Sequence, residues 1–274
     1  SGETGIGRMM EPEQIAQAIE GLGAHGRLAG RRVVVSAGPT REPLDPVRYI
    51  SNRSSGKMGF LLAAHAARAG ADTVLVAGPV SLPTPDRVRR LDVTTAREMQ
   101  EAVNANARDA DLVIMTAAVS DFRPRVAAPR KIKKRDVEEH LRLELEHNPD
   151  ILRSLREVAP RSVRVGFAAE TDNLEEGALT KMREKDFEFL VANDVSRGDI
   201  GFDSDANEVT VYRREGKPVF FPRRSKDVLA VKLIELFATA LGDREQKPTV
   251  VSQRGPGVSG RDRLSRSLPV RRRR

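Results

Sequence analysis

The chain of 274 residues has no cysteine and no tryptophan, and only 4% of its residues are aromatic. The lack of cysteine excludes a disulfide framework, a thiolate zinc site and a cysteine nucleophile, and it fits a reducing, cytoplasmic setting. The scarcity of aromatic residues disfavours surfaces that bind RNA or single strands by base stacking. Apolar runs all stay well short of the roughly 18 residues that span a bilayer. We therefore expect no membrane segment and no secretory leader.

Positive charge is concentrated at one end of the chain. Residues 243–274 hold ten Lys/Arg and three Asp/Glu, a net charge of +7 out of a total of +8. This tail is rich in Arg, Ser, Gly and Pro, and we predict that it is disordered. The sequence pI of about 10.1 suggests a polyanionic partner, but the residues before the tail carry only +1. Nucleic acid is therefore disfavoured as a partner of those residues, and binding by the tail stays the alternative.

Short apolar runs alternate with helical patterns through the middle of the chain. Strands are predicted at 31–38, 72–78, 111–119, 162–170 and 187–194. Helices are predicted at 59–69, 95–107, 148–159 and 173–185, with Thr94 or Thr95 capping the second and Asn148 and Pro149 starting the third. This alternation predicts a three-layer, Rossmann-like α/β fold with a mostly parallel sheet and helices on both faces. An antiparallel hairpin is predicted at 207–214 and 217–224, followed by a last helix at 225–241.

The loop after the first strand, residues 37–59, is long and polar. It ends at the start of a predicted helix, where backbone N–H groups and the helix dipole can hold phosphate. The residues we expect to make these phosphate contacts are Ser54, Ser55, Gly56 and Lys57. A solvated loop with serine caps is the alternative.

Two familiar nucleotide motifs are excluded. A Walker loop would need glycine at position 51 and a hydroxyl residue at 58, where this chain has Ser51 and Met58. The first strand is followed by Gly38-Pro39-Thr40 rather than by the G-x-G-x-x-G fingerprint of dinucleotide enzymes. A nicotinamide-dependent oxidoreductase is therefore disfavoured.

A second polar loop covers residues 116–135. Asp121 follows a predicted strand, where it either holds a hydrated Mg²⁺ on phosphates or caps a turn. Seven Lys/Arg lie between 123 and 135, and they form either a solvated loop or a mobile lid that brings Lys131 over an anion. Lys181 and Lys185 share one helix face and either point at one ligand or are ordinary surface lysines.

The stretch SAGPTREPLDPVRYISNRSSGKMG, residues 36–59, strongly resembles the signature of the bacterial phosphopantothenate–cysteine ligase. TAAVSDFRP, KIKK, NPDIL, GFAAET and VANDVS follow in the family's order. The N-terminal GRMMEPEQIAQAIEGL resembles the end of the flavin-dependent decarboxylase that is usually fused ahead of this ligase. The resemblance implies a remnant of that domain and a linker at 1–29, a ligase domain at 30–242, and a tail at 243–274.

The resemblance implies a ligase of coenzyme A biosynthesis. Members of the family use CTP, with Mg²⁺, to convert 4′-phosphopantothenate to an acyl-cytidylate. L-cysteine then displaces CMP and gives 4′-phosphopantothenoylcysteine. The 207–224 hairpin is similar to the family's dimerisation segment, which implies a homodimer. Ser120 stands where alanine is common in the family, and we expect this small side chain to be tolerated.

The resemblance also implies roles for individual residues, each assigned to a position of this sequence that matches a motif of the family. Asn52 matches the family's key asparagine and is expected to hold the acyl-cytidylate, with Arg48 assisting and contacting phosphopantothenate. Lys131 completes the expected catalytic set, and Asp121 is expected to contact Mg²⁺ or the ribose. The positions that match the family's CTP site are Ala117, Asp121, Lys131, Pro149, Asp150, Ile151, Leu152, Phe167, Lys181 and Lys185.

Overall fold

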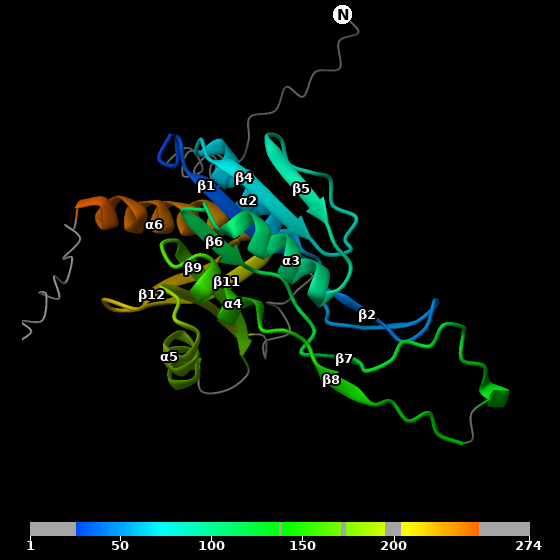
Figure 1. Ribbon diagram of the computed structural model, residues 1–274. Coiled ribbons are helices and arrows are strands. Elements are labelled where there is room, and N and C mark those ends of the chain that lie inside the picture. Colours follow the sequence, from blue (N-terminus) through cyan, green and yellow to red (C-terminus); the bar gives the residue numbers. More distant parts are fainter. Residues whose placement is uncertain (1–25, 137–138, 171–173, 195–203, 247–274) are drawn as a thin grey trace, which may run out of the picture.

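The computed structural model describes residues 26–136, 139–170, 174–194 and 204–246. Its main sheet has eight strands in the order β12-β11-β10-β9-β6-β1-β4-β5 (Figure 1). The parallel strands are β1 Arg32–Ala37, β4 Asp72–Ala77, β5 Val88–Asp92, β6 Leu112–Met115, β9 Val163–Glu170 and β10 Phe189–Asp194. The antiparallel strands at one edge are β11 Ala206–Arg213 and β12 Val219–Ser225. The predicted α/β class and the hairpin are thus confirmed.

Helices cover both faces of the sheet, as the alternating pattern predicts. One face packs against α2 Lys57–Arg68 and α6 Lys226–Gln246, with Phe60 and Phe237 in that core. The other face packs against α3 Ala96–Ala107, α4 Ile151–Val158 and α5 Leu174–Lys185. The central strands are rich in β-branched residues and buried on both sides, which is typical of a parallel sheet enclosed by helices.

Several element boundaries differ from those predicted. Thr95 caps α3 with a complete capping box, as expected. However, α4 begins at Ile151 with Asp150 as its N-cap, so the predicted start at Asn148 and Pro149 is wrong. Asn148 is instead held by the preceding loop. Helix α6 continues to Gln246, past its predicted end at 241, so residues 243–246 of the tail are helical and not disordered as predicted. The sequence also predicts a short helix at 11–22 from the spacing of its apolar residues. That range and residues 247–274 lie outside the described residues.

Short strands that the sequence pattern does not reveal shape two projections from the sheet. Strands β2 Arg41–Pro43 and β3 Tyr49–Ser51 form a small hairpin within the first polar loop. Strands β7 Phe122–Pro124 and β8 Leu145–His147 form the base of an arm that extends away from the sheet and carries a short 3-10 turn, η1 Lys134–Asp136 (Figure 1). The basic loop at 123–135 therefore belongs to this arm.

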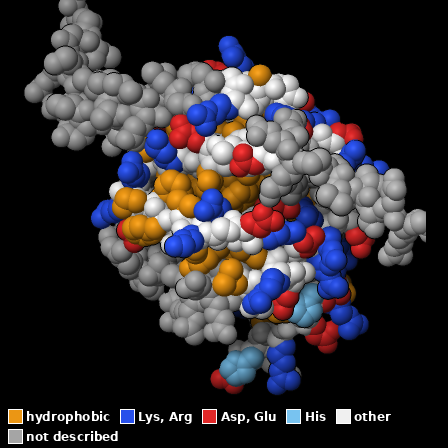
Figure 2. Space-filling model, turned by 90° about the vertical axis from the view of Figure 1, so that its left-hand side faces the viewer, with side chains coloured by type: hydrophobic (Ala, Val, Ile, Leu, Met, Phe, Trp, Pro, Cys, Tyr) orange, Lys and Arg blue, Asp and Glu red, His pale blue; other side chains and the backbone are white. Residues whose placement is uncertain are grey.

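Basic and acidic side chains are interspersed on the face shown in Figure 2, with apolar patches between them. This mixture agrees with the small net charge predicted for the residues before the tail. Among the described residues, no helix has the length and apolar character required to cross a membrane.

Candidate functional site

The polar loops meet where the winding of the sheet reverses. Strand β1 lies between β4 on one side and β6 on the other, so the chain winds outward in opposite directions from this point. Open α/β sheets bind ligands in the crevice at such a switch point, beyond the carboxyl ends of the strands. The loops that leave β1 and β6 here touch through a bridge between Pro39 and Ala118.

Close packing brings the start of α2 to this crevice. Gly56 is the N-cap of α2, with a φ of 76° and no side-chain cap hydrogen bond. A Cβ on Gly59 would lie 2.4 Å from Thr116 Oγ1 and 2.5 Å from Ala37 Cβ, so only glycine lets the helix approach β1 and β6 this closely. The first N–H groups of α2 have no partners within the helix, and they open toward the crevice.

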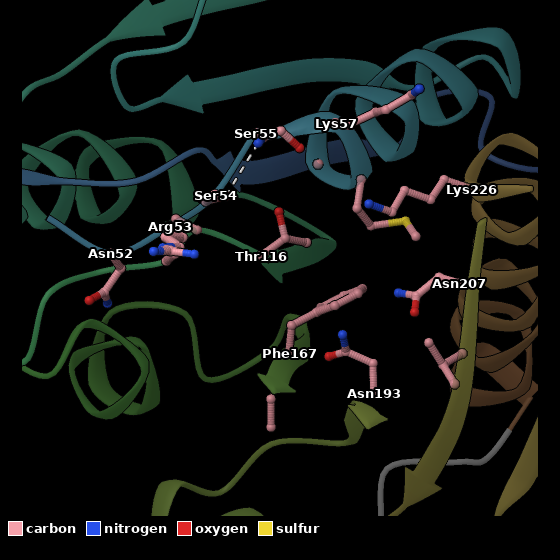
Figure 3. Close-up of a pocket in the computed structure, with 17 residues that line it drawn as sticks. Asn52, Arg53, Ser54, Ser55, Lys57, Thr116, Phe167, Asn193, Asn207 and Lys226 are labelled. Carbon is pink, nitrogen blue, oxygen red and sulfur yellow. Dashed lines mark hydrogen bonds between the residues drawn. The ribbon is translucent and has the colours of Figure 1, made fainter. Parts of the chain in front are cut away.

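A cavity of about 490 Å³ lies at this position. Its walls come from the first polar loop and α2, from the segment after β6, and from β9, β10, β11 and the first residue of α6. Figure 3 shows Asn52 and Arg53 on one side, Lys226 and Asn207 on the other, and the Phe167 ring between them. The predicted site residues that line it are Asn52, Ser54, Ser55, Gly56, Lys57, Ala117 and Phe167.

The cavity has a cationic lining. Three of its residues, Arg53, Lys57 and Lys226, are basic, and none is Asp or Glu. The ammonium of Lys57 forms an ion pair with Asp205, which lies outside the lining, and it points away from Phe167 (Figure 3). The hydrogen bond and charge of Lys57 hold the pKa of the Asp205 carboxyl below its ordinary value, and the charge of Lys226 adds to this effect.

Asn52 connects the first loop to the second. Its Nδ2 donates to the carbonyl oxygen of Val119 at 3.0 Å. The adjoining residues are held from the other side by Asn148, which donates from Nδ2 to Ser120 O and from its backbone N–H to Asp121 O, both at 2.8 Å. The 116–121 segment is therefore fixed between the cavity and the start of α4.

The expected CTP residues near α4 form a second group beside the cavity. Asp150 accepts a hydrogen bond from Arg153 N at 3.1 Å and lies 3.0 Å from Lys185 Nζ. Ile151 is buried in the core beneath α4, so a ligand would meet its backbone rather than its side chain. Leu152 is partly buried, and Pro149 lines a shallow hollow next to Asn148. The side chain of Lys181 is outside the described residues.

A buried carboxylate that the sequence did not indicate joins Arg48 to the backbone next to Lys131. Asp45 accepts hydrogen bonds from the backbone N–H groups of Val47 and Arg48, from the Arg48 guanidinium, and from Ile132 N at 3.1 Å. Arg48 also donates to the carbonyl oxygen of Ile132 at 2.9 Å. The Arg48 guanidinium holds the pKa of Asp45 far below its ordinary value. The segment of the arm between β7 and β8 is thus tied to the first loop, right beside the exposed Lys131.

Asp121 is compatible with a metal that arrives with a nucleotide. Its side chain is exposed at the end of the segment that Asn52 holds. Within the described ranges, no three His, Asp or Glu side chains gather as a metal cage. Mg²⁺ commonly binds one or two protein carboxylates and completes its shell with water and substrate phosphates, and a single aspartate suits that role.

Three residues of the cavity lining were not predicted from the sequence: Asn193, Asn207 and Lys226. They come from β10, β11 and the first turn of α6, far along the chain from the polar loops. Asn193 lies within VANDVS, a string of the family resemblance, which was the one available signal. For Asn207 and Lys226 the sequence offers no signal, because only the antiparallel edge of the sheet brings them to the cavity.

Curated proteins are similar to this chain over most of its length. The chain is 43% identical to the coenzyme A biosynthesis bifunctional protein CoaBC of Vibrio vulnificus over 242 residues, 88% of this chain and 60% of that protein. It is 44% identical to CoaBC of Escherichia coli over 249 residues, 90% of this chain and 61% of that protein. The chain therefore spans about 60% of the length of these curated relatives.

Solved structures show the same fold. A crystal structure of the C-terminal domain of CoaBC is 38% identical, has a TM-score of 0.68, and covers 80% of this chain and 99% of its own. A variant of Cab2 in complex with phosphopantothenate-cysteine has a TM-score of 0.66 at 19% identity, covers 86% of this chain and 95% of its own, and shows a likeness of fold. The CoaBC relatives confirm the family resemblance drawn from residues 36–59. Since the model of the DNA/pantothenate metabolism flavoprotein C-terminal domain matches residues 28–241, the chain belongs to that family.

Proposed function

We propose that this chain is the ligase part of a coenzyme A biosynthesis enzyme, which joins 4′-phosphopantothenate to L-cysteine with CTP as the activating nucleotide. The observation that carries this proposal is the convergence of Asn52, the start of α2 and the 116–121 segment on one cavity at the switch point of the sheet. The names of the relatives, which are coenzyme A biosynthesis proteins, support the substrate assignment.

The proposed reaction has two steps. A carboxylate oxygen of phosphopantothenate attacks the α-phosphorus of CTP and pyrophosphate leaves, which gives an acyl-cytidylate. The amine of cysteine then attacks the acyl carbon, loses a proton, and CMP leaves. Neither step requires a nucleophile from the protein, which agrees with a chain that has no cysteine. What the steps need is positive charge and hydrogen-bond donors where phosphate charge develops, and the cavity lining supplies both.

Each expected residue has a task in this scheme. Asn52 lies at the junction of the two loops, where its carboxamide would hold the acyl-phosphate group. Arg48 would meet the acid, and Lys131 on the arm would meet the nucleotide phosphates. Asp150 and Lys185 would hold CTP beside α4, with Lys185 at a phosphate or at the base. Mg²⁺, bound by Asp121 together with the triphosphate, would neutralise phosphate charge.

We also propose a cytoplasmic homodimer. Five large apolar side chains among the described residues of the arm are exposed, and so is Phe220 on edge strand β12. Exposed apolar groups of this kind are typical of surfaces that meet another protein. The arm residues are Phe122, Val126, Leu141, Leu143 and Leu145. Light scattering on the purified chain should give twice the mass of one chain, and a monomer would contradict the proposal.

The bifunctional relatives suggest that the natural partner domain is a flavin-dependent decarboxylase, fused to or associated with this one.

A substrate-dependence experiment tests the ligase proposal. Pyrophosphate release should require both CTP and 4′-phosphopantothenate, and CMP and phosphopantothenoylcysteine should form only after L-cysteine is added. Omission of Mg²⁺ should abolish both steps. Release of pyrophosphate without phosphopantothenate would refute the acyl-cytidylate route, and equal activity with ATP would refute the nucleotide assignment.

A further inference from the structure

A separate cavity of about 380 Å³ lies at the end of the sheet opposite the candidate site. It is formed by α5, by the residues between α5 and β10, and by the end of β11, where the parallel strands β9 and β10 begin. This end of the sheet is at the left of Figure 1 and faces the viewer in Figure 2, where basic side chains border apolar ones. We call it the α5 cavity, and among the described residues it shares no lining residue with the cavity at the switch point. Its lining consists of Leu179, Met182, Arg183, Asp186, Phe187, Arg213 and Arg214.

Two arginines of the α5 cavity are held in place by backbone oxygens. Arg213 donates from Nε and Nη2 to the carbonyl oxygen of Lys217 at 3.0 and 2.8 Å, across the turn between β11 and β12. Gly216 in that turn has a φ of 95°, and a Cβ there would lie 3.2 Å from Arg213 Nη2, so glycine leaves room for the guanidinium. Arg183 donates from Nε to Leu179 O at 3.3 Å. Both guanidinium groups keep further N–H donors for a ligand.

Acidic side chains do not balance these two cations. Asp186 is the one acid among the described lining residues, and it already lies 2.7 Å from Arg214 Nη2 and 3.3 Å from Arg164 Nη2. Burial acts to raise the pKa of Asp186, but the charges of Arg214 and Arg164 outweigh it and hold that pKa below its ordinary value. In the part of the chain that the structure describes, no carboxylate pairs with Arg183 or Arg213. Three arginines against one aspartate give the lining a net charge of +2.

The ion network behind the α5 cavity is itself short of acceptors. The Arg164 side chain on β9 is 5% exposed, and its Nε and Nη1 have no hydrogen-bond partner among the described residues. Its Nη2 shares Asp186 with Arg214 and lies 3.7 Å from Glu188. A buried cation that lacks acceptors costs free energy. Added negative charge at this end of the sheet would therefore stabilise the cluster.

The floor of the α5 cavity is apolar. Met182 and Phe187 are buried in the core under α5, and Leu179 is exposed beside them. Small-molecule sites typically combine an apolar lining with a few polar groups that fix the orientation of the ligand. Guanidinium groups repel metal cations, and their paired N–H donors match the oxygens of phosphate. The cavity therefore suits a small molecule with a phosphate group at the arginines and an apolar part on the floor.

We propose that the α5 cavity is a second ligand site, which binds a small phosphate monoester that carries an apolar group. The three arginines would hold the phosphate oxygens, and the apolar floor would contact the rest of the molecule. A phosphate dianion matches the net charge of the lining, whereas a carboxylate would neutralise only half of it. The site lies at the far end of the sheet from the candidate site, and its ligand takes no part in the ligase reaction proposed above.

Calorimetric titration with phenyl phosphate tests the site. The wild-type chain should bind phenyl phosphate, and Arg213→Met should raise the Kd by about 10- to 100-fold because a charge-assisted contact is lost. Arg183→Met should raise it by a similar factor, and because this side chain is exposed it serves as the second variant should the Arg213 substitution disturb the turn. The matched control is Arg68→Met in the last turn of α2, which is exposed, lines neither cavity and should bind like the wild type. A wild-type chain that does not bind phenyl phosphate, or a Kd that neither variant changes, would overturn the site.

Two comparisons test the chemistry of the ligand. Inorganic phosphate should bind several-fold more weakly than phenyl phosphate because it leaves the apolar floor uncovered, and equal affinities would overturn the apolar part of the assignment. Vesicles that contain phosphatidic acid should not bind through these arginines. Sedimentation with such vesicles that both Arg213→Met and Arg183→Met abolish would point to a lipid headgroup and overturn the small-molecule assignment. The titrations use neither CTP nor 4′-phosphopantothenate, so their outcome is independent of the ligase proposal.

Discussion

Replacing Lys185 by methionine separates a nucleotide contact from a surface ion pair. Lys185 Nζ lies 3.0 Å from Asp150 Oδ2, and the two side chains are 33% and 40% exposed. Pairs at this exposure contribute about 0.2–1 kcal/mol to folding, and salt screens them. If Lys185 also contacts a CTP phosphate, its loss should weaken CTP binding by about 1.5–3 kcal/mol, or about 10- to 150-fold in Kd. Lys185→Met should therefore change binding much more than stability.

Two measurements on the same protein test this expectation. Calorimetry gives Kd for CTP, and urea unfolding gives the change in stability. The control is Arg156→Met on α4, whose side chain is 64% exposed and lies 4.0 Å from Asp186, away from the Asp150 pair. An unchanged CTP affinity with intact stability would refute the reasoning and make Lys185 an ordinary surface lysine. A large loss of stability would show that the Asp150 pair is structural.

Three further predictions concern the loops around the cavity. Asn52→Asp should impair turnover but leave the calorimetric Kd for CTP largely intact; lost CTP affinity with normal transfer to cysteine would contradict the role of Asn52. The lowered pKa of Asp45 means that its ionised form stabilises the fold fully above about pH 4 and less as the pH falls below that. Asp45→Asn should therefore flatten the acid side of a plot of urea midpoint against pH, and an equally steep acid side would argue against this. Ser120 Oγ is buried without a hydrogen-bond partner, so Ser120→Ala should stabilise the protein by about 1 kcal/mol in urea unfolding, and a loss of stability would show that the hydroxyl is satisfied.

The fold could be predicted where strands are buried on both faces. β1, β4 and β6 are short runs rich in β-branched residues. Their continuous apolar character distinguishes them from the amphipathic helical patterns that lie between them in the sequence. β5 has the sequence VRRLD and is half exposed at the edge of the sheet, so its charged residues conceal it. β2, β3, β7 and β8 are three residues each, too short for an alternating pattern to indicate a strand.

The candidate site was predictable in part for a similar reason. Asn52 and the residues up to Lys57 lie in one continuous polar loop before a helix, and such a loop is visible in the sequence. Asp45 reads as an ordinary turn residue, and its burial beneath Arg48 and Ile132 depends on how the arm folds back. Lys226 reads as the first polar residue of a helix, and only the sheet order places it opposite Asn52.

The carboxylate of Asp45 has a consequence for how the two substrates influence each other. It binds Arg48, on the loop expected to meet the acid, and the backbone of Ile132, next to the lysine expected to meet the nucleotide. Under the proposed function, a nucleotide that drew Lys131 inward would therefore also reposition Arg48. Coupling free energies between two sites are reciprocal, so the factor by which CTP changes the affinity for the acid equals the factor by which the acid changes the affinity for CTP. Under the proposed function, one buried side chain would thus make each substrate an effector of the other.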